Sequence, residues 1–391
     1  MEERPIYLDY QATTPCDPCV VEAMLPFFTE RCGNPHARAH AYGWEAEEAI
    51  ETARSRIAQA INADPREVIF TSGATEANNL ALKGVAQFYK DRGHKKHIIT
   101  TQIEHDCVLE SCRSLEKQGF MVTYLPVQKD GLVVLDDLRK AITEETLLVS
   151  IMTANNEIGV IQPIAEIGAL CREAGIFFHT DAAQALGKIA LDVNALSVDL
   201  MSLSSHKIYG PKGVGALYCR LKPRVGLAPL LSGGGQERGL RSGTLPVPLC
   251  VGFGAACHLA CTLKDKENAR LLILRNRLYE KLCADLPKIY LNGHFEKRLA
   301  GNLNISFEGI EGEGLLMGVK NLALSTGSAC NSMSLEPSHV LLALGMDPGL
   351  IHGSVRISLG RFTTEEEIDC AAESLIAAVR KLRAMSPLWE E

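Results

Sequence analysis

The chain has 391 residues and a net charge of −7, from 40 Lys and Arg against 47 Asp and Glu. It has no basic block of the kind that binds nucleic acid and no apolar run as long as a membrane span. Its thirteen cysteines are spread over the whole length, which indicates reduced thiols rather than a disulfide framework. We therefore expect a cytoplasmic protein with no nucleic-acid or membrane partner, divided by its length into a large and a smaller domain.

The first two thirds of the chain show an α/β pattern. A short strand is expected at residues 6–9, and the spacing of Ile50, Ala53 and Ile57 predicts a helix with one apolar face. Helices then alternate with strands, which we predict at residues 68–70, 98–101, 121–127, 147–152, 175–178, 198–203 and 214–218. This alternation is typical of a buried parallel sheet whose ligands bind at the carboxyl ends of the strands.

A long helix predicted at residues 251–286 carries the chain out of this pattern, and we place the domain change near its first third. The remainder is typical of an α+β domain, ending in a helix that begins at the capping box Thr364-Glu365-Glu366-Glu367. Further elements are expected at residues 289–291, 304–307, 314–319 and 354–359. We therefore assign residues 16–263 to the large domain, and residues 1–15 and 264–391 to the small domain.

Small residues fill the turn TSGATE at residues 71–76, between a predicted strand and a helix. Backbone N–H groups exposed at the start of a helix can bind a phosphate. An ordinary capped turn, with Thr75 satisfying the helix start, is the alternative that this segment alone leaves open.

Asp181 and Lys207 follow two neighbouring apolar runs of the predicted sheet. A carboxylate on a ring nitrogen and an amine on an aldehyde hold pyridoxal phosphate from two sides. The lysine forms a Schiff base, and the aspartate keeps the ring able to accept electrons. For such a pair taken alone, a surface lysine and a strand-end aspartate are the favoured interpretation, and the cofactor site needs further motifs to support it.

Three further segments carry candidate site residues. His105 stands at a helix start, where it can cap the helix, lie on a cofactor ring or move protons. The adjacent amides Asn155 and Asn156 can cap a turn or bind a cofactor or substrate oxygen. Cys330 lies among small polar residues in STGSACNS, which suits an exposed nucleophile.

Taken together, nine motifs resemble those of the cysteine desulfurases of the NifS/IscS type. They occur in the family's order from Tyr7 to about Trp389, and the STGSACNS loop is similar to that of the long-loop class. The motifs are LDYQATTP, TSGATEANN, EHDCVL, NNEIGVIQP, DAAQALGK, SSHKIYGPKGVGALY, GGGQERGLRSGT, STGSACNS and VRISLGRF.

This resemblance implies the type I fold of pyridoxal-phosphate enzymes, with an aspartate aminotransferase-like large domain, a mostly parallel sheet and a smaller α+β domain. It implies a homodimer with both active sites at the interface. The implied reaction converts L-cysteine to L-alanine and leaves a persulfide on Cys330. An iron–sulfur scaffold protein and other acceptors, including those of tRNA thiolation, would receive the sulfur.

The resemblance also implies roles for single residues. Lys207 would bind the cofactor, Asp181 would pair with its ring nitrogen, and Cys330 would carry sulfur. His105 would stack on the ring and act catalytically. No resident metal is implied, although Cys330 would transiently ligate a cluster iron. Gln184 would bind the ring hydroxyl, Asn156 would lie near the ring hydroxyl and the substrate, and Arg356 would bind the substrate carboxylate. The remaining cofactor-binding residues, on the phosphate side, would be Ala74, Thr75, Ser204, Ser205, His206 and Thr244 of the partner subunit.

Three features depart from the family pattern. Ser205 stands where relatives usually have glycine, so we expect a different backbone angle there. Thr153 and Ala154 replace a usual His-Val pair, and the tail that helps to dock the scaffold in relatives is shorter. Two other functions remain open, an aminotransferase or β-lyase on the same fold, and a sulfur carrier or scaffold subunit without turnover.

Overall fold

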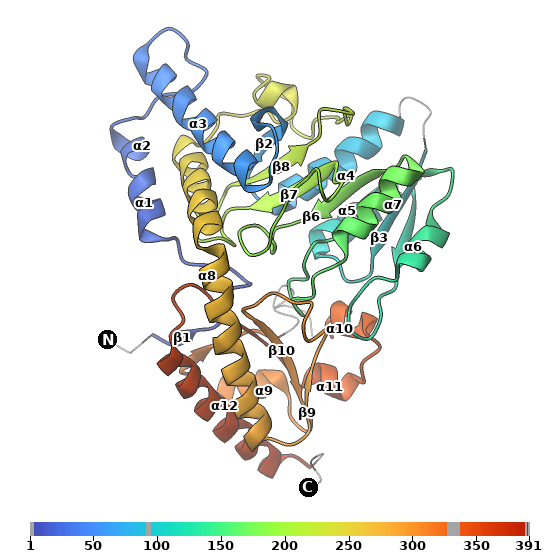
Figure 1. The fold of residues 1–391 in the computed structure, drawn as a ribbon, viewed down its shortest axis with the longest axis vertical. Helices are drawn as coiled ribbons and strands as arrows, with labels where there is room; N and C mark the ends of the chain where they lie inside the picture. Colours follow the sequence, from blue (N-terminus) through green and yellow to red (C-terminus); the bar gives the residue numbers. More distant parts are fainter. Residues whose placement is uncertain (1–3, 91–94, 327–336, 388, 390–391) are drawn as a thin grey trace.

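A seven-stranded sheet forms the centre of the larger part of the molecule (Figure 1). The structure is a computed structural model that describes residues 4–90, 95–326, 337–387 and 389. The strands of this sheet are β2 (Val68–Thr71), β3 (His97–Thr101), β4 (Met121–Leu125), β5 (Thr146–Ser150), β6 (Phe177–Asp181), β7 (Leu200–Ser204) and β8 (Gly215–Cys219). Their order across the sheet is β2-β8-β7-β6-β5-β3-β4.

The sheet is mostly parallel, which confirms the predicted fold class. Strands β4, β3, β5, β6 and β7 run parallel to one another, whereas β8 is antiparallel to both β7 and β2. The expectation of parallel pairing is therefore wrong at this edge. Only residues 205–214 connect β7 to β8, and a parallel crossover needs a dozen residues or more.

Helices cover both faces of the sheet. Successive strand residues point to opposite faces, so Ile98 and Leu148 pack under α4 and α5 while Val149 packs under α3 and α7. The helices of this part are α1 (Pro18–Met24), α2 (Pro26–Thr29), α3 (Ala41–Ala60), α4 (Ala74–Lys90), α5 (Asp106–Glu116), α6 (Leu135–Ala141) and α7 (Ile164–Ala174). Because both faces are covered, the strands are apolar runs without polar alternation, as the sequence indicates.

The smaller part is built on a three-stranded antiparallel sheet of order β12-β10-β9. The N-terminal strand β1 belongs here as well, since it pairs with β11. The elements are β1 (Ile6–Tyr7), β9 (Ile289–Leu291), β10 (Asn302–Phe307), α9 (Gly312–Gly318), β11 (Leu322–Ala323), α10 (His339–Ala343), α11 (Pro348–His352), β12 (Ser354–Ser358) and α12 (Glu365–Met385). The predicted capping box is confirmed: Thr364 caps α12 and Glu367 bonds back to it.

Helix α8 (Val247–Asp285) runs through both parts of the molecule (Figure 1). Its length and apolar composition would suffice to cross a membrane, but its apolar side chains contribute to two cores. Phe253 and Ala260 pack in the core of the large sheet, whereas Leu271 and Leu278 pack in the core of the small one. The helix thus changes cores between residues 260 and 271, a span that includes the boundary predicted at residue 263.

A buried ion pair ties α3 to the large sheet. The guanidinium of Arg54 donates to both carboxylate oxygens of Glu237 at 2.8 Å, and Glu237 also accepts the backbone N–H of Phe70 at 2.7 Å. Both charged side chains are more than nine-tenths buried. Breaking such a pair leaves an uncompensated buried charge.

We expect Arg54→Met to lower the free energy of unfolding by about 3–5 kcal/mol, because Glu237 would remain buried and unpaired. Urea denaturation measures this change. Arg66→Met is the matched control, since Arg66 and Asp64 form an exposed pair whose loss should change stability little. Equal stability of the two variants would show that the buried pair does not hold α3 to the sheet.

Candidate active site

A cavity of about 560 Å³ lies at the carboxyl ends of the parallel strands. The end of β6, the segment after β7 and the start of α4 all contribute to its wall. The structure brings nine of the predicted residues together there: Ala74, Thr75, His105, Asn156, Asp181, Gln184, Ser204, His206 and Lys207.

Strand register places the acid and the amine at one edge of the sheet. Strands β6 and β7 are parallel neighbours, and Asp181 pairs with Ser202. Asp181 is the last residue of β6, and Lys207 follows three residues after Ser204, where β7 ends. Both side chains line the same cavity, from two different strands.

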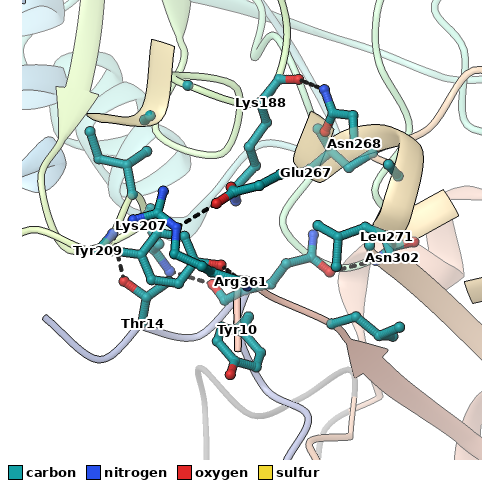
Figure 2. A pocket seen from close by; sticks show the side chains of 18 residues that line it. Tyr10, Thr14, Lys188, Lys207, Tyr209, Glu267, Asn268, Leu271, Asn302 and Arg361 are labelled. Atoms are coloured by element: carbon teal, nitrogen blue, oxygen red, sulfur yellow. Dashed lines mark hydrogen bonds and ion pairs between the residues drawn. The ribbon is translucent and has the colours of Figure 1, made fainter. Parts of the chain in front are cut away.

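Main-chain carbonyl groups orient the amine of Lys207. Its Nζ donates to the oxygen of Gln11 at 2.5 Å and to that of Ala12 at 2.7 Å. Lys207 also lines a second, much smaller cavity of about 40 Å³, together with Lys188 and Tyr209 (Figure 2). Lys207 therefore lines both the large cavity and a small space beside α8.

Backbone and amide donors hold the carboxylate of Asp181. Oδ2 accepts from Asn78 Nδ2 at 2.7 Å, and Oδ1 accepts from the N–H of Ala183 at 2.9 Å. The residue is 6% exposed, so its charge acts in a water-poor environment. Hydrogen bonds to a carboxylate are roughly twice as strong as neutral ones, and these two stabilise the charged form.

The opposite end of the cavity can bind an anion. Gly73, with φ +156, makes the sharp turn from β2 into α4, whose first residues Ala74 and Thr75 line the wall. The hydroxyl of Ser204 is buried there and has no partner within the described part of the chain. Burial and three nearby lysines lower the pKa of His206 to about 4, so its ring is neutral near pH 7.

His105 both caps a helix and lines the cavity. It is the N-cap residue of α5, where its Nδ1 accepts the N–H of Cys107 at 3.2 Å. The alternative roles suggested by sequence are therefore compatible: the cap orients the ring, and the ring still borders the cavity. Because Nδ1 accepts a hydrogen bond, the neutral ring carries its proton on Nε2.

The residue before it, Glu104, is a buried acid that sequence reasoning missed. Its Oε1 accepts from Thr101 Oγ1 at 2.8 Å and from the N–H of Met152 at 2.9 Å. Burial raises the pKa of Glu104 to about 8, and the charge of Asp181 adds to this. Near neutral pH, Glu104 is thus mostly protonated and adds little negative charge beside Asp181.

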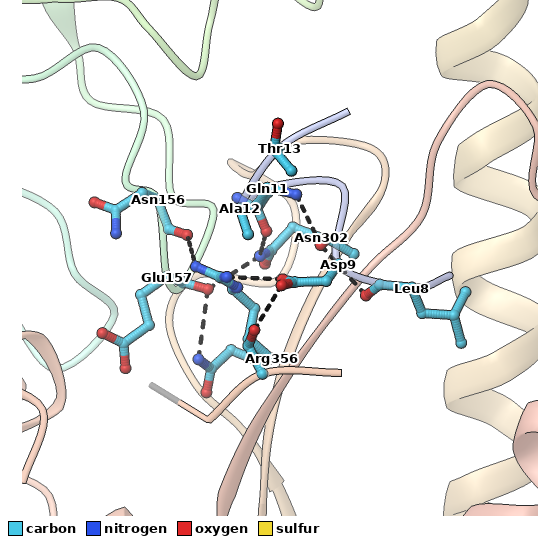
Figure 3. Close-up of polar contacts among 12 residues, drawn as sticks. Leu8, Asp9, Gln11, Ala12, Thr13, Asn156, Glu157, Asn302 and Arg356 are labelled. Carbon is cyan, nitrogen blue, oxygen red and sulfur yellow. Dashed lines mark hydrogen bonds and ion pairs between the residues drawn. The ribbon is translucent and has the colours of Figure 1, made fainter. Parts of the chain in front are cut away.

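Arg356 does not line the cavity but lies directly behind its wall (Figure 3). Its Nη2 donates to Asp9 Oδ1 at 2.8 Å, and its Nη1 donates to the main-chain oxygen of Asn156 at 2.9 Å. The Nε is buried and has no partner among the residues described. The predicted role in binding a substrate carboxylate stays a prediction, and Asp9 is a competing anion that the sequence did not indicate.

The remaining predicted residues lie elsewhere. Ser205 is fully buried beside the cavity and has no positive φ. Its hydroxyl fits only because residue 210 is a glycine: a Cβ at Gly210 would lie 2.1 Å from the serine Oγ. The position therefore does not require the backbone freedom of glycine. Thr244 is exposed away from the cavity, and Cys330 lies outside the described residues.

The described residues offer neither a disulfide nor a metal site as a further functional feature. All twelve cysteines in the part of the chain that the structure describes are free. Those same described residues contain no group of three or more His, Cys, Asp or Glu side chains arranged to hold a metal ion. Asn78 and Cys107 are additional site residues; both lie in the quoted motifs, but nothing in the sequence indicated their contacts.

Comparison with protein families assigns the class. The profile of the family Aminotransferase class-V matches residues 6–370, so the chain belongs to this family. Its members are enzymes that use pyridoxal phosphate, and this is the cofactor of the present chain.

Curated relatives of high identity carry a narrower name. The chain is 59% identical to "Cysteine desulfurase" of Mus musculus, over 99% of this chain and 84% of that protein. It is 56% identical to "Cysteine desulfurase IscS" of Rickettsia rickettsii, over 99% and 94% of the two chains.

Two solved structures share the fold. A "NIFS-like protein" superposes with a TM-score of 0.90 at 39% identity, covering 96% of this chain and 100% of its own. "SspA in complex with cysteine" superposes with a TM-score of 0.80 at 40% identity, covering 92% and 100%. The sequence resemblance to cysteine desulfurases is thereby confirmed at the level of the whole chain.

The cavity fits pyridoxal phosphate. The unpartnered hydroxyl of Ser204 and the start of α4 form an anion site, as the phosphate requires. Lys207 and Asp181 provide the amine and the carboxylate that the aldehyde and the ring nitrogen require, from two sides of one cavity.

The neutral Glu104 makes stability depend on pH. Its folded pKa of about 8 lies above the ordinary value of 4.5, so the native protein binds the proton more tightly than the unfolded chain. Its contribution to stability is complete below about pH 4.5 and is lost as pH rises toward 8. Relative to Glu104→Gln, the wild type should lose on the order of 1 kcal/mol per pH unit across this window.

Urea denaturation of both proteins at several pH values between about 5 and 8 measures this difference. Other groups that titrate in the window, such as Glu157, are common to both proteins and cancel. Glu110→Gln is the control, because Glu110 is an exposed acid on α5. A stability difference that stays constant with pH would contradict a protonated Glu104.

Proposed function

We propose that the protein is a pyridoxal-phosphate cysteine desulfurase that converts L-cysteine to L-alanine and keeps the sulfur as a persulfide on Cys330. The observation that carries this proposal is the placement of Lys207 and Asp181 in one cavity with an anion site. Cys330, in its STGSAC segment, and the names of the relatives support the choice of reaction.

The cofactor, when bound, takes up the electron pair released at the substrate Cα. The residues of this chain then have separate tasks. Lys207 would hold the aldehyde of the cofactor and, with its Nζ free, would take the Cα proton. Asp181, held by Asn78 and Ala183, would keep the ring nitrogen protonated. His105, which lines the same cavity, would move a proton at Nε2.

The sulfur step follows from thiol chemistry. The Cys330 thiolate attacks the substrate Sγ and forms an S–S bond while the Cβ–Sγ bond breaks. The carbon fragment keeps the electron pair of the broken bond and is protonated to L-alanine. The transferred sulfur is oxidised by two electrons and the carbon is reduced by two, so no external oxidant is needed.

We further propose that Arg356 and Asn156 bind the substrate. The buried Nε of Arg356 lacks a partner in the described structure, and a substrate carboxylate would satisfy it. The guanidinium is already anchored to the main chain of Asn156, which lines the cavity. Asp9 would then be the residue that holds Arg356 in place while the substrate binds.

The reaction is tested by measuring alanine and sulfide together from L-cysteine. Cys330→Ser should abolish sulfide release while the visible absorbance of the bound cofactor remains, because the serine lacks the thiolate. Lys207→Ala should lose the absorbance band of the lysine-bound cofactor. Cys370→Ser, an exposed cysteine on α12, is the matched control and should keep full activity.

Undiminished turnover in Cys330→Ser would remove that thiol from the mechanism. Pyruvate in place of alanine would indicate a β-lyase, and absence of both would indicate a carrier or scaffold subunit. Adding an iron–sulfur scaffold protein to the assay tests the proposed sulfur acceptor: persulfide on Cys330 should decline as sulfur moves to the scaffold.

We also propose a homodimer whose partner copy completes each active site. Thr244 is exposed here, so it is accessible to the phosphate site of a second copy. Helices α1 to α3 flank α8 and carry large exposed apolar side chains, each more than half exposed (Figure 1). These side chains are Leu25, Phe28, Tyr42 and Trp44.

Light scattering should give twice the chain mass of 42.5 kDa. Leu25→Asp combined with Phe28→Asp should shift the equilibrium to monomer, because two charges would be buried in the interface. Ile273→Asp, a still more exposed position on the part of α8 that packs in the small core, should leave the dimer intact. A monomeric wild type at all concentrations would reject the dimer.

A further inference from the structure

Asn78 links the carboxylate of Asp181 to a thiol of the same cavity. It lies on α4 and is fully buried. Its Nδ2 donates to Asp181 Oδ2 at 2.7 Å and to Cys107 Sγ at 3.2 Å. A single amide thus serves a residue at the end of β6 and a residue of the first turn of α5.

The orientation of this amide is determined by its neighbours. The Asn78 Oδ1 is buried without a partner in the described part of the molecule. Turning the amide over would lose the bond to Asp181, because it would place the amide oxygen against the carboxylate oxygen. The amide therefore keeps both N–H groups on Asp181 and Cys107, at the cost of an unsatisfied oxygen.

Cys107 continues the connection to His105. Its Sγ lies 3.1 Å from His105 Nδ1, and its backbone N–H donates to the same nitrogen at 3.2 Å. A nitrogen that accepts the backbone N–H has no proton of its own, so the thiol is the donor in the second contact. The sulfur in turn accepts from Asn78, so the bonds run outward from the Asn78 amide, one to Asp181 and the other through Cys107 to His105.

We propose that Asn78 and Cys107 are positioning residues that couple Asp181 to His105 and hold the His105 ring in its Nε2-protonated form. Neither residue takes part in a bond change. The inference rests on the proposed function, in which Asp181 meets the ring nitrogen of the cofactor and His105 meets its face.

Because Asn78 lies on α4, it connects this network to the anion end of the cavity. Ala74 and Thr75, at the start of the same helix, line the anion end of the cavity, and Asn78 follows one turn later. Residues three and four apart lie on one face of a helix. Helix α4 therefore sets the relative positions of the phosphate site, the carboxylate and the imidazole, although these belong to different strand ends.

The test uses the full-length, cofactor-loaded protein with histidine labelled by ¹⁵N. His105 resonances, assigned by their loss in His105→Asn, report which nitrogen is protonated and at what pH the second proton binds. Cys107→Ala removes the thiol donor to Nδ1, and Cys107→Ser restores an O–H donor at the same place. No substrate is added.

Removing a donor from Nδ1 makes protonation of the ring easier. We expect Cys107→Ala to shift the Nδ1 resonance and to raise the titration midpoint of His105 by roughly 0.5–1 pH unit, a three- to tenfold change in the equilibrium. Cys107→Ser should titrate close to wild type. Asn78→Ala should shift the midpoint in the same direction and weaken cofactor retention, because Asp181 loses a donor too.

Other ionisable groups also influence His105, and the matched pair of variants controls for them. Glu104 and Asp106 flank it in sequence, Asp181, His206 and Lys207 share its cavity, and His339 packs from α10. These groups are the same in the alanine and serine variants. The Cys107 contrast therefore isolates the thiol.

Identical titration of wild type, Cys107→Ala and Cys107→Ser would overturn the proposal, because a cysteine that only fills space would not move the His105 proton. A midpoint that moves equally in both variants would also overturn it. Failure of the proposed function would instead appear as absent alanine formation, a measurement on which the titration does not depend.

Discussion

The parallel pairing of β6 and β7 is the constraint on which the site depends. The register that joins Asp181 to Ser202 brings the ends of the two strands to one edge of the sheet. Both strands are almost wholly buried, so slipping the register by one residue would turn the apolar side chains of β7 from one core to the other. Hydrophobic burial over the whole sheet thus fixes a polar arrangement at its edge.

The N-terminal segment connects this edge to the small sheet. After β1, Asp9 pairs with Arg356 on β12 (Figure 3). The carbonyl groups of Gln11 and Ala12 hold the amine of Lys207. The side chain of Gln11 also accepts a hydrogen bond from Asn302 on β10. Lys207 is therefore oriented by a segment that is itself anchored on the other part of the molecule. A displacement of the small sheet would therefore move the Lys207 amine, through the hydrogen bonds that join Asn302 to Gln11 and Gln11 to Lys207.

Much of the fold follows from local pattern, because apolar runs and turn residues are properties of short segments. All seven strands of the large sheet and the core-spanning α8 lie within a few residues of the expected positions. The antiparallel β8 was missed because strand direction depends on the length of the connection, not on the strand itself. The site residues carried by the motifs also assemble in one cavity, apart from Thr244, Arg356 and Ser205, which do not line it, and Cys330, which lies outside the described residues.

What sequence could not indicate are contacts between distant residues and the charges that follow from burial. Asp9 and Arg356 are separated by 347 positions, and no local signal pairs them. Glu104 would be an ordinary ionised acid at a helix start, yet burial raises its pKa to about 8, as burial and nearby lysines lower that of His206 to about 4. Both shifts favour the neutral forms. The fold thereby removes the charge of these two groups beside the site, while the carboxylate of Asp181, held by two donors, can act on whatever occupies the cavity.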